Sequence, residues 1–222
     1  MAHTPIHLEN RTQDGARKFS PTAANNRGPI GEVISPLIAQ NAKVLEIASG
    51  TGEHALHMCG LRPDILWQPT DPDADSRTSQ NAWASELRAH EFEADKAGGQ
   101  MLPSLDIDTT QEDWTSKVGS CDLIYCANMI HIAPWEAAIG MVKGAAQLLS
   151  KGQLFILYGP FKEGEATAPS NLDFDISLKS RNPAWGVRDL EDVKHIFELH
   201  GFNAQQRTAM PKNNQILVFK RA

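Results

Sequence analysis

The stretch Val44-Leu45-Glu46-Ile47-Ala48-Ser49-Gly50-Thr51-Gly52-Glu53-His54 decides the fold of this chain. Its first half is an apolar run that carries one acid, Glu46, and is typical of a buried strand. A turn of small residues follows, and a helical pattern comes behind it. Glycines in such a turn allow the backbone to approach a ligand closely, and the following helix points its N-terminus at that ligand. The stretch therefore predicts a strand, a ligand-binding turn and a helix.

The composition is that of an ordinary globular domain. The chain has 222 residues, of which 41% are hydrophobic and 22% charged, which suits an α/β domain with a full-sized core. The formal net charge is -6 and no basic run is present, which argues against nucleic acid or an anionic membrane as a partner. No apolar segment approaches the roughly 20 residues that span a bilayer, and the N-terminus lacks the pattern of a signal peptide. Because Cys59, Cys121 and Cys126 show no paired metal spacing, we expect reduced thiols, no metal site and a cytoplasmic protein.

Strand-like runs alternate with helical patterns through the first 160 or so residues, which predicts a parallel sheet built from right-handed crossovers. The polar, non-periodic residues 1–20 predict a flexible N-terminal arm that is able to fold over the site. The expected strands cover residues 43–48, 65–69, about 102–105, 121–127 and 153–158, and the expected helices cover 29–39, 53–59, 74–88 and 135–149.

The C-terminal third has a different pattern. Leu190, Val193 and Phe197 mark a helix that ends at Gly201. Residues 202–208 and 215–220 then predict two strands joined by a short turn, an antiparallel hairpin. A parallel sheet that ends in such a hairpin differs from a plain dinucleotide-binding fold. With no repeat and no linker, residues 21–222 are expected to form one domain.

The glycine turn is compatible with two cofactors. Gly50-x-Gly52-x-x-Ala55 satisfies the dinucleotide fingerprint, which makes NAD one candidate. Glu46 favours S-adenosylmethionine, because a charge inside a strand is costly without a partner and this cofactor carries a cationic sulfonium and ammonium. The turn also opens with Ala48-Ser49 rather than with glycine. The alternative is that Glu46 pairs with a structural Lys or Arg.

Two further acids follow predicted strands and extend the same site. Asp71 ends the second strand, about 20 residues beyond the turn, where a carboxylate can accept both ribose hydroxyls. Alternatively, Asp71 and Asp73 cap the next helix. Asp106 is placed to accept from an adenine amino group, with Ile107 packing on the ring. Its alternative is a turn acid beside a core isoleucine.

Candidate residues for the reaction follow the fourth and fifth strands. Ligands of open parallel sheets bind at the carboxyl ends of the strands, where Asn128, Met129 and His131 are expected. A base is needed only if an acceptor must lose a proton, and His131, Tyr158 and Asp175 are the candidates. His131 could equally be an ordinary histidine at a helix start, and Tyr158 a tyrosine at the edge of the core.

With these residues, the chain resembles the class I S-adenosylmethionine-dependent methyltransferases, and within them an uncharacterised methyltransferase-like family with bacterial and animal members. The resemblance implies a Rossmann-like α/β fold, with a seven-stranded, mostly parallel sheet, a C-terminal antiparallel hairpin and helices on both faces. It does not supply a substrate. It rests on Asn26-Arg27, Leu45-Glu46-Ile47-Ala48-Ser49-Gly50-Thr51-Gly52-Glu53-His54, Trp67-Gln68-Pro69-Thr70-Asp71, Asn128-Met129-Ile130-His131, Tyr158-Gly159-Pro160-Phe161, Asn182-Pro183-Ala184-Trp185-Gly186-Val187-Arg188-Asp189 and Pro211-Lys212-Asn213-Asn214.

The predicted function is methyl transfer from S-adenosylmethionine to a small molecule by in-line displacement. The alternatives are a non-catalytic module that binds the same cofactor and an NAD-dependent oxidoreductase. Polar and aromatic residues at 171–188 predict an acceptor-binding cap inside an insertion around 161–188, with a structured loop as the alternative. The residues expected to bind the cofactor are Glu46, Ala48, Ser49, Gly50, Gly52, His54, Asp71, Asp106, Ile107, Asn128 and Met129. Those expected to bind the acceptor are Asn26, Arg27, Phe161, Asp175, Trp185 and Arg188, where each arginine could instead form a structural ion pair.

Overall fold

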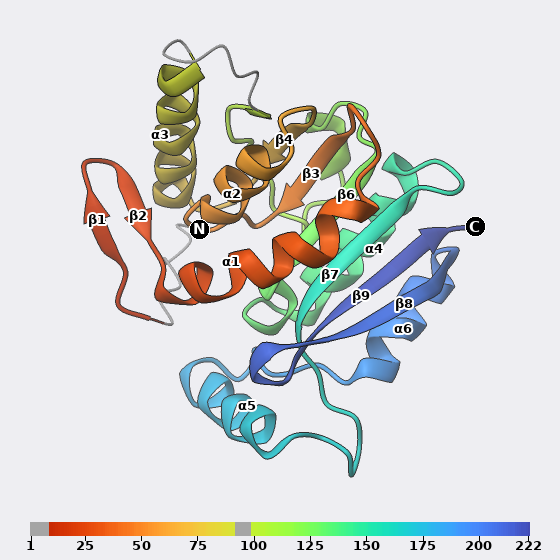
Figure 1. Cartoon of the computed structure of the whole chain (residues 1–222). Helices are drawn as coiled ribbons and strands as arrows, with labels where there is room; N and C mark the ends of the chain where they lie inside the picture. The colour runs from red at the N-terminus through yellow and green to blue at the C-terminus, as the bar shows by residue number, and fades with distance from the viewer. Residues whose placement is uncertain (1–8, 92–98) are drawn as a thin grey trace. The chain divides into compact units, whose positions relative to one another are not determined.

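The computed structural model describes residues 9–91 and 99–222 and shows an α/β protein (Figure 1). Seven strands form one sheet in the order β5-β4-β3-β6-β7-β9-β8, and β1 and β2 form a separate hairpin. The β3–β4 and β4–β5 pairs are parallel, whereas β9 pairs antiparallel with both β7 and β8. The predicted fold class is confirmed. The strands are β1 (Thr12–Asp14), β2 (Arg17–Phe19), β3 (Lys43–Ile47), β4 (Leu66–Pro69), β5 (Gln100–Met101), β6 (Leu123–Ala127), β7 (Leu154–Pro160), β8 (Phe202–Met210) and β9 (Asn214–Arg221).

Six α-helices and four 3-10 turns accompany these strands in the described residues. None of these helices combines the length and the apolar character that crossing a membrane requires. The helices are α1 (Pro21–Ile34), α2 (Glu53–Leu61), α3 (Ala74–Glu91), α4 (Trp135–Leu148), α5 (Pro169–Arg181) and α6 (Leu190–Leu199), and the 3-10 turns are η1 (Ser35–Leu37), η2 (Trp114–Lys117), η3 (Met129–His131) and η4 (Pro211–Asn213).

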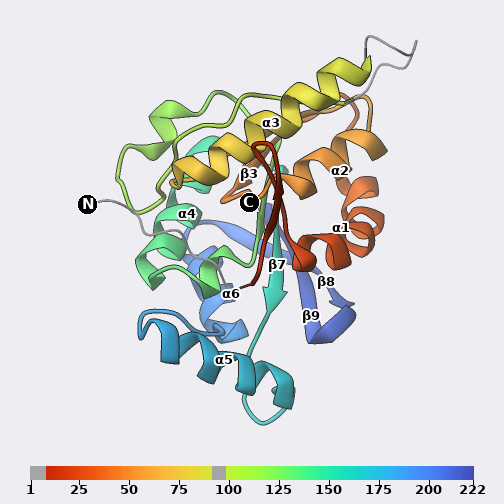
Figure 2. The same cartoon turned by 90° about the vertical axis from the view of Figure 1, so that its left-hand side faces the viewer.

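The chain divides into two compact units, one of residues up to 107 with 117–125, the other of residues 108–116 with 126–222. In the first unit, β3 buries all its residues after Lys43, as parallel strands covered on both faces do. The β1–β2 hairpin lies beside α3 in both views (Figures 1 and 2). It is held there by Trp83, which packs edge-on against Phe19 with ring centroids 5.1 Å apart and lies under the Arg17 guanidinium.

The N-terminal part of this unit differs from the sequence expectation. Helix α1 begins at Pro21 rather than at Pro29, because Ser20 caps it by accepting from the Ala23 N–H at 3.0 Å. A proline in the first turn is favourable, and Pro29 is instead accommodated inside the helix. The arm predicted over residues 1–20 contains the β1–β2 hairpin in its described part. Residues 1–8 lie outside the described residues, and the flexibility of the arm stays a prediction.

The second unit contains β7, β8 and β9 with α4, α5 and α6. Phe197 of α6 stacks on Phe219 of β9, with ring centroids 3.7 Å apart, and packs edge-on against Phe155 of β7. The predicted C-terminal hairpin is confirmed as the antiparallel β8–β9 pair.

Helix α5 was not predicted as a helix. Its buried positions are Asn171, Asp175 and Leu178, so two of the three inward residues are polar and the apolar periodicity is weak. The third predicted strand is also shorter and earlier than expected. Strand β5 ends at Met101, before Pro103, which has no N–H to donate, and Leu105 forms only an isolated bridge with Thr70.

Candidate functional site

The glycine turn between β3 and α2 is a tight turn built from residues in left-handed backbone conformations. Ala48, Gly50 and Gly52 all have positive φ, at 55°, 55° and 90°. A Cβ at Gly52 would lie 3.1 Å from the Gln80 Cα and 3.3 Å from the Met101 methyl, so packing requires glycine there. A Cβ at Gly50 would find within 4 Å only the Arg11 Nη2 atom, at 3.9 Å, among the described residues. The backbone at Gly50 is therefore the part of the turn that a ligand can approach.

Asp71 lies just beyond β4 and joins it to the turn. Its Oδ2 accepts from the Gly50 N–H and its Oδ1 from the Asp73 N–H, both at 3.0 Å. The side chain is buried, and this burial raises its pKa to about 6. Two hydrogen bonds leave further lone pairs on the carboxylate for a ligand. The helix-capping role belongs to Asp73, whose Oδ2 accepts from the Ser76 N–H at 2.8 Å.

Glu46 is 2% exposed and is bound inside the first unit. Its Oε2 accepts from the Trp67 indole N–H at 2.8 Å, and its Oε1 lies 3.9 Å from His54 Nδ1. Burial raises the pKa of Glu46 to about 7, and burial lowers that of His54 to about 4. The partners of Glu46 are therefore an indole and a neutral imidazole, not the Lys or Arg of the alternative reading.

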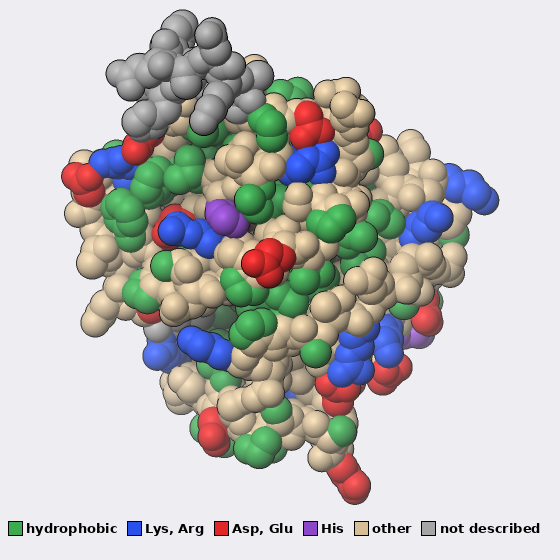
Figure 3. All heavy atoms as spheres, viewed as in Figure 1, with side chains coloured by type: hydrophobic (Ala, Val, Ile, Leu, Met, Phe, Trp, Pro, Cys, Tyr) green, Lys and Arg blue, Asp and Glu red, His purple; other side chains and the backbone are tan. Residues whose placement is uncertain are grey.

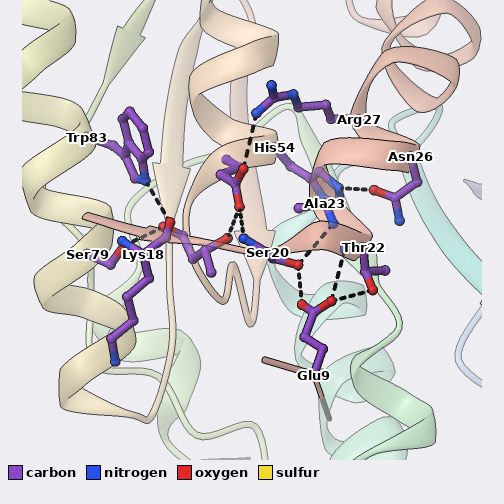
Figure 4. A network of polar contacts seen from close by, with 12 residues as sticks. Glu9, Lys18, Ser20, Thr22, Ala23, Asn26, Arg27, His54, Ser79 and Trp83 are labelled. Carbon is purple, nitrogen blue, oxygen red and sulfur yellow. Dashed lines mark hydrogen bonds and ion pairs between the residues drawn. The ribbon is translucent and has the colours of Figure 1, made fainter. Parts of the chain in front are cut away.

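Helix α1 holds the first turn of α2, directly behind the glycine turn (Figure 4). Asn26 Oδ1 lies 2.8 Å from His54 Nε2, and Arg27 Nη1 lies 3.2 Å from Glu53 Oε1. Buried Glu53 also accepts from the Ser20 N–H at 2.6 Å and from the Thr51 hydroxyl at 3.0 Å. The side chains of Asn26 and Arg27, expected to contact an acceptor, are thus engaged with α2, and Arg27 forms the structural ion pair given as its alternative.

Asp106 and Ile107, the residues predicted to contact adenine, end the longer stretch of the first unit. The Ile107 side chain is buried, whereas the Asp106 side chain is 65% exposed and its Oδ1 lies 3.3 Å from Arg77 Nη1. The Asp106 carboxylate is therefore accessible to a ligand. Its contact with adenine stays a prediction.

In the second unit, the residues after β6 form a buried polar corner. Asn128 has a φ of 61° and its N–H donates to the Tyr158 carbonyl, and Met129 is buried. His131 is 1% exposed, its Nδ1 accepts from the Arg188 N–H at 3.3 Å, and its Nε2 has no hydrogen-bond partner in the part of the chain that the structure describes. Burial, helped by the Arg188 charge, lowers the pKa of His131 to about 3. The imidazole is therefore neutral and a weak base.

Tyr158 lies inside β7, where it is buried opposite Ile216 of β9, rather than at the end of the strand. Phe161 follows β7, is buried, and packs edge-on against His131 with ring centroids 5.4 Å apart. The burial of Tyr158 agrees with the alternative of a core tyrosine.

The segment after α5 is held by the residues predicted to bind the acceptor. Asp175 Oδ1 accepts from the Val187 N–H at 2.8 Å, and its Oδ2 pairs with Lys179. The Arg188 guanidinium donates to the carbonyls of Ile130, Ala133 and Ala184, and its carbon lies 5.3 Å from the centre of the Trp135 ring. Trp185 is partly exposed. Asp175 and Arg188 thus organise the loop in which an acceptor contact was predicted.

The sequence reasoning missed Arg11, which lies against the glycine turn. It stands in a polar segment without periodicity, and nothing in that segment signals a contact with residue 50. The Ser20-Pro21 pair was a usable signal for the start of α1, since a serine cap followed by proline is typical of helix N-termini.

A family model described as "Protein of unknown function (DUF938)" matches residues 17–221. The chain belongs to this family. The DUF938 description assigns no activity.

The solved structures most similar to this DUF938 chain include methyltransferases at low sequence identity. An O-methyltransferase family protein from Burkholderia thailandensis has a TM-score of 0.72 at 14% identity, over 90% of this chain and 57% of its own. The pyocyanin biosynthetic protein PhzM has a TM-score of 0.68 at 15% identity, over 90% and 56%. Magnesium protoporphyrin IX methyltransferase from Synechocystis PCC 6803, with bound SAH (S-adenosylhomocysteine), has a TM-score of 0.62 at 16% identity, over 89% and 83%. The chain thus spans just over half the length of the first two neighbours, and the likeness shows a Rossmann-like methyltransferase fold.

Proposed function

We propose that this protein binds S-adenosylmethionine and transfers its methyl group to a small molecule. The observation that carries the proposal is the glycine turn, where the backbone at Gly50 is open and the Asp71 carboxylate is fixed beside it. Methyltransferases share the fold, and two of them, CalO1 and the magnesium protoporphyrin IX methyltransferase, were crystallised with SAH.

The residues of the first unit fit this cofactor. The remaining lone pairs of Asp71 suit ribose hydroxyls, and the accessible carboxylate of Asp106 suits an adenine amino group beside the apolar side chain of Ile107. When bound, S-adenosylmethionine supplies a methyl carbon on a cationic sulfur that leaves as a neutral thioether. The chain then contributes mainly alignment for the in-line displacement, which is worth up to about 7–11 kcal/mol in favourable cases.

His131 and Tyr158 are the residues that we propose to act on the acceptor in methyl transfer. Because His131 Nδ1 accepts from a backbone N–H, the ring proton belongs on Nε2. With a pKa lowered to about 3, this imidazole is better suited to donate a hydrogen bond than to take up a proton. An acceptor atom that is already unprotonated needs no base and fits this arrangement.

The charge distribution supports a small-molecule acceptor. The net charge is -6, and on the face drawn in Figure 3 the basic and acidic side chains of the described residues lie scattered, without one extended basic patch. Binding to nucleic acid depends on such a patch, because phosphates dominate the affinity. Cys59, Cys121 and Cys126 are buried and form no disulfide, which supports the proposed cytoplasmic location.

A non-catalytic module that binds the same cofactor is the second candidate. The burial of both His131 and Tyr158 favours it, since neither side chain is accessible to an acceptor in this structure.

The first test is calorimetry with S-adenosylmethionine, S-adenosylhomocysteine and NAD. We expect both sulfur nucleosides to bind and NAD not to bind, and the reverse pattern would contradict the proposal. A metabolite extract is then screened for acceptor-dependent release of S-adenosylhomocysteine, beside tRNA, DNA and protein fractions. Release confined to a dialysed macromolecular fraction would contradict a small-molecule acceptor, and binding without release in any fraction would favour the second candidate.

A further inference from the structure

Arg11, just before β1, places a cation against the glycine turn. Its Nη2 atom lies 3.9 Å from the position that a Cβ would take on Gly50. The charge of Arg11 also acts on Asp71, where it opposes the rise in the pKa of that carboxyl that burial causes. The guanidinium therefore lies beside both features that define the proposed cofactor site.

The hydrogen bonds of Arg11 are incomplete. Its Nε is buried and has no hydrogen-bond partner among the described residues, and the carboxylate of Glu9, its salt-bridge partner, lies 3.8 Å from this atom. Glu9 is committed elsewhere, because its carboxylate accepts from Ser20 and from the N–H and hydroxyl of Thr22. Leaving a buried donor of a charged group unpaired is costly. The site thus has a cation with unused donors next to open backbone.

Other arginines of the same unit are engaged. Arg27 pairs with buried Glu53 at 3.2 Å, and Arg77 pairs with Asp106 at 3.3 Å and donates to the Asp71 and Pro72 carbonyls at 2.8 Å. Arg11 differs from them because its ion pair among the described residues is the long one to Glu9, at 3.8 Å, and its Nη2 atom lies against the turn.

The segment that carries Arg11 is anchored on three helices. Glu9 accepts from the Thr22 N–H of α1 at 2.9 Å, the Lys18 N–H donates to Ser79 of α3 at 2.8 Å, and the Ser20 N–H donates to Glu53 of α2 (Figure 4). These bonds lie on both sides of Arg11 in the sequence. The fold of this unit therefore anchors the backbone on both sides of Arg11.

We propose that Arg11 binds the carboxylate of the amino-acid part of the cofactor and makes the site selective for nucleosides that carry a carboxylate. This inference rests on the proposed function. Glu46 and Asp71 near the turn are acids, which favour the cationic groups of S-adenosylmethionine but oppose its carboxylate. A guanidinium provides the opposite charge and a planar pair of donors that matches a carboxylate. The unpaired Nε of Arg11 then gains a hydrogen-bond partner that residues 9–91 and 99–222 do not provide.

The test compares two ligands on two variants by calorimetry. S-adenosylhomocysteine carries the amino-acid carboxylate, whereas 5′-methylthioadenosine has the same nucleoside and a thioether sulfur but no carboxylate. We expect Arg11→Ala to weaken binding of S-adenosylhomocysteine by about 10- to 100-fold, as loss of a charge-assisted hydrogen bond does. Binding of 5′-methylthioadenosine should change by less than about twofold, since the lost contact is to the carboxylate. Arg17→Ala is the matched control, because it removes a cation of the same segment that pairs with Glu86 and Asp14 instead.

The outcomes separate this proposal from the proposed function. An equal loss for both ligands in Arg11→Ala would show a purely structural role, and tighter binding of both would show that Arg11 blocks the site. Either result overturns the proposal while the proposed function stands. A wild-type protein that binds neither ligand overturns the proposed function itself. Circular dichroism and thermal melting of Arg11→Ala confirm that the variant is folded.

Discussion

The glycine turn of the first unit and the corner around His131 in the second both contain buried polar side chains, but these side chains are satisfied differently. Asp71 and Glu46 each receive hydrogen bonds from the protein and keep lone pairs for more. His131 keeps its buried Nε2 without a partner among the described residues, and Asp175 and Arg188 hold the loop after α5. The glycine turn therefore combines open backbone with fixed acceptors, as the proposed cofactor site requires, whereas buried polar residues alone equally describe a structural corner.

The strongest test of the turn is Gly52→Ala. Gly52 has a left-handed backbone conformation, and a Cβ there would meet the Gln80 backbone. Backbone strain and overpacking together should therefore lower the free energy of unfolding by about 2–5 kcal/mol. Urea unfolding measures this loss. Gly60→Ala, where a Cβ meets nothing within 4 Å, is the control and should be stable. Equal stabilities of the two variants would show that the turn tolerates a side chain.

Glu46 makes the free energy of unfolding depend on pH. Its pKa is about 7 in the folded protein and near 4.5 when unfolded, so the folded state keeps a proton that the unfolded state has released between these values. The free energy of unfolding should therefore fall as the pH rises from about 5 to 7, by up to about 3 kcal/mol. Glu46→Gln removes this fall and still allows a bond from Trp67.

The measurement is urea unfolding of wild type and Glu46→Gln between pH 5 and 8. The lowered pKa values of His54 and His131 act in the opposite direction, so the difference between the two proteins isolates Glu46. The exposed Glu112→Gln is the matched control. A constant difference across this range would contradict the prediction.

In the second unit, Gly159→Ala tests the packing around His131. A Cβ at Gly159 would lie 2.5 Å from His131 Nε2, so the ring must move, at a cost of about 1–3 kcal/mol. Thermal melting measures the cost, and calorimetry with S-adenosylhomocysteine tests cofactor binding. We expect lower stability with unchanged affinity. Lost affinity at full stability would show that this corner, and not the turn alone, holds the cofactor.

The most specific test of the turn separates two neighbouring acids. Asp71→Ala should weaken S-adenosylhomocysteine binding by roughly 1–3 kcal/mol, because the ribose hydroxyls lose a charged acceptor. Asp73→Ala should instead lower stability by about 1 kcal/mol, because α3 loses its cap. Calorimetry and urea unfolding on both variants check the pair. Unchanged affinity in Asp71→Ala would show that this acid only holds the backbone, through its bonds from the Gly50 and Asp73 N–H groups.

The sequence predicts the parts of this fold whose signals are local. The strand, turn and helix around Gly50 and the C-terminal hairpin follow from apolar patterns with turn residues at fixed positions. Helix α5 does not, because Asn171 and Asp175 occupy its buried face and carry no apolar signal.

The candidate site was predictable to the level of residue type. Asp71 and Asp73 both follow β4 at suitable distances, and only hydrogen bonds distinguish the capping acid from the one that holds the turn. The contact of Arg11 with the turn depends on how a distant segment folds back, which no local pattern encodes. The depth at which His131 is buried, and therefore its low pKa, depends equally on packing by Phe161 and Arg188.

The buried carboxylate of Glu53 has a consequence for local unfolding. It joins the Ser20 amide, the Arg27 guanidinium and the Thr51 hydroxyl, which belong to two separate stretches of chain, α1 with its cap and the glycine turn. Opening either stretch leaves this buried carboxylate with fewer partners, which makes the two open cooperatively. Hydrogen exchange at the Ser20 amide would then report local opening of the glycine turn. A nucleoside bound at the turn should slow this exchange without contacting Ser20.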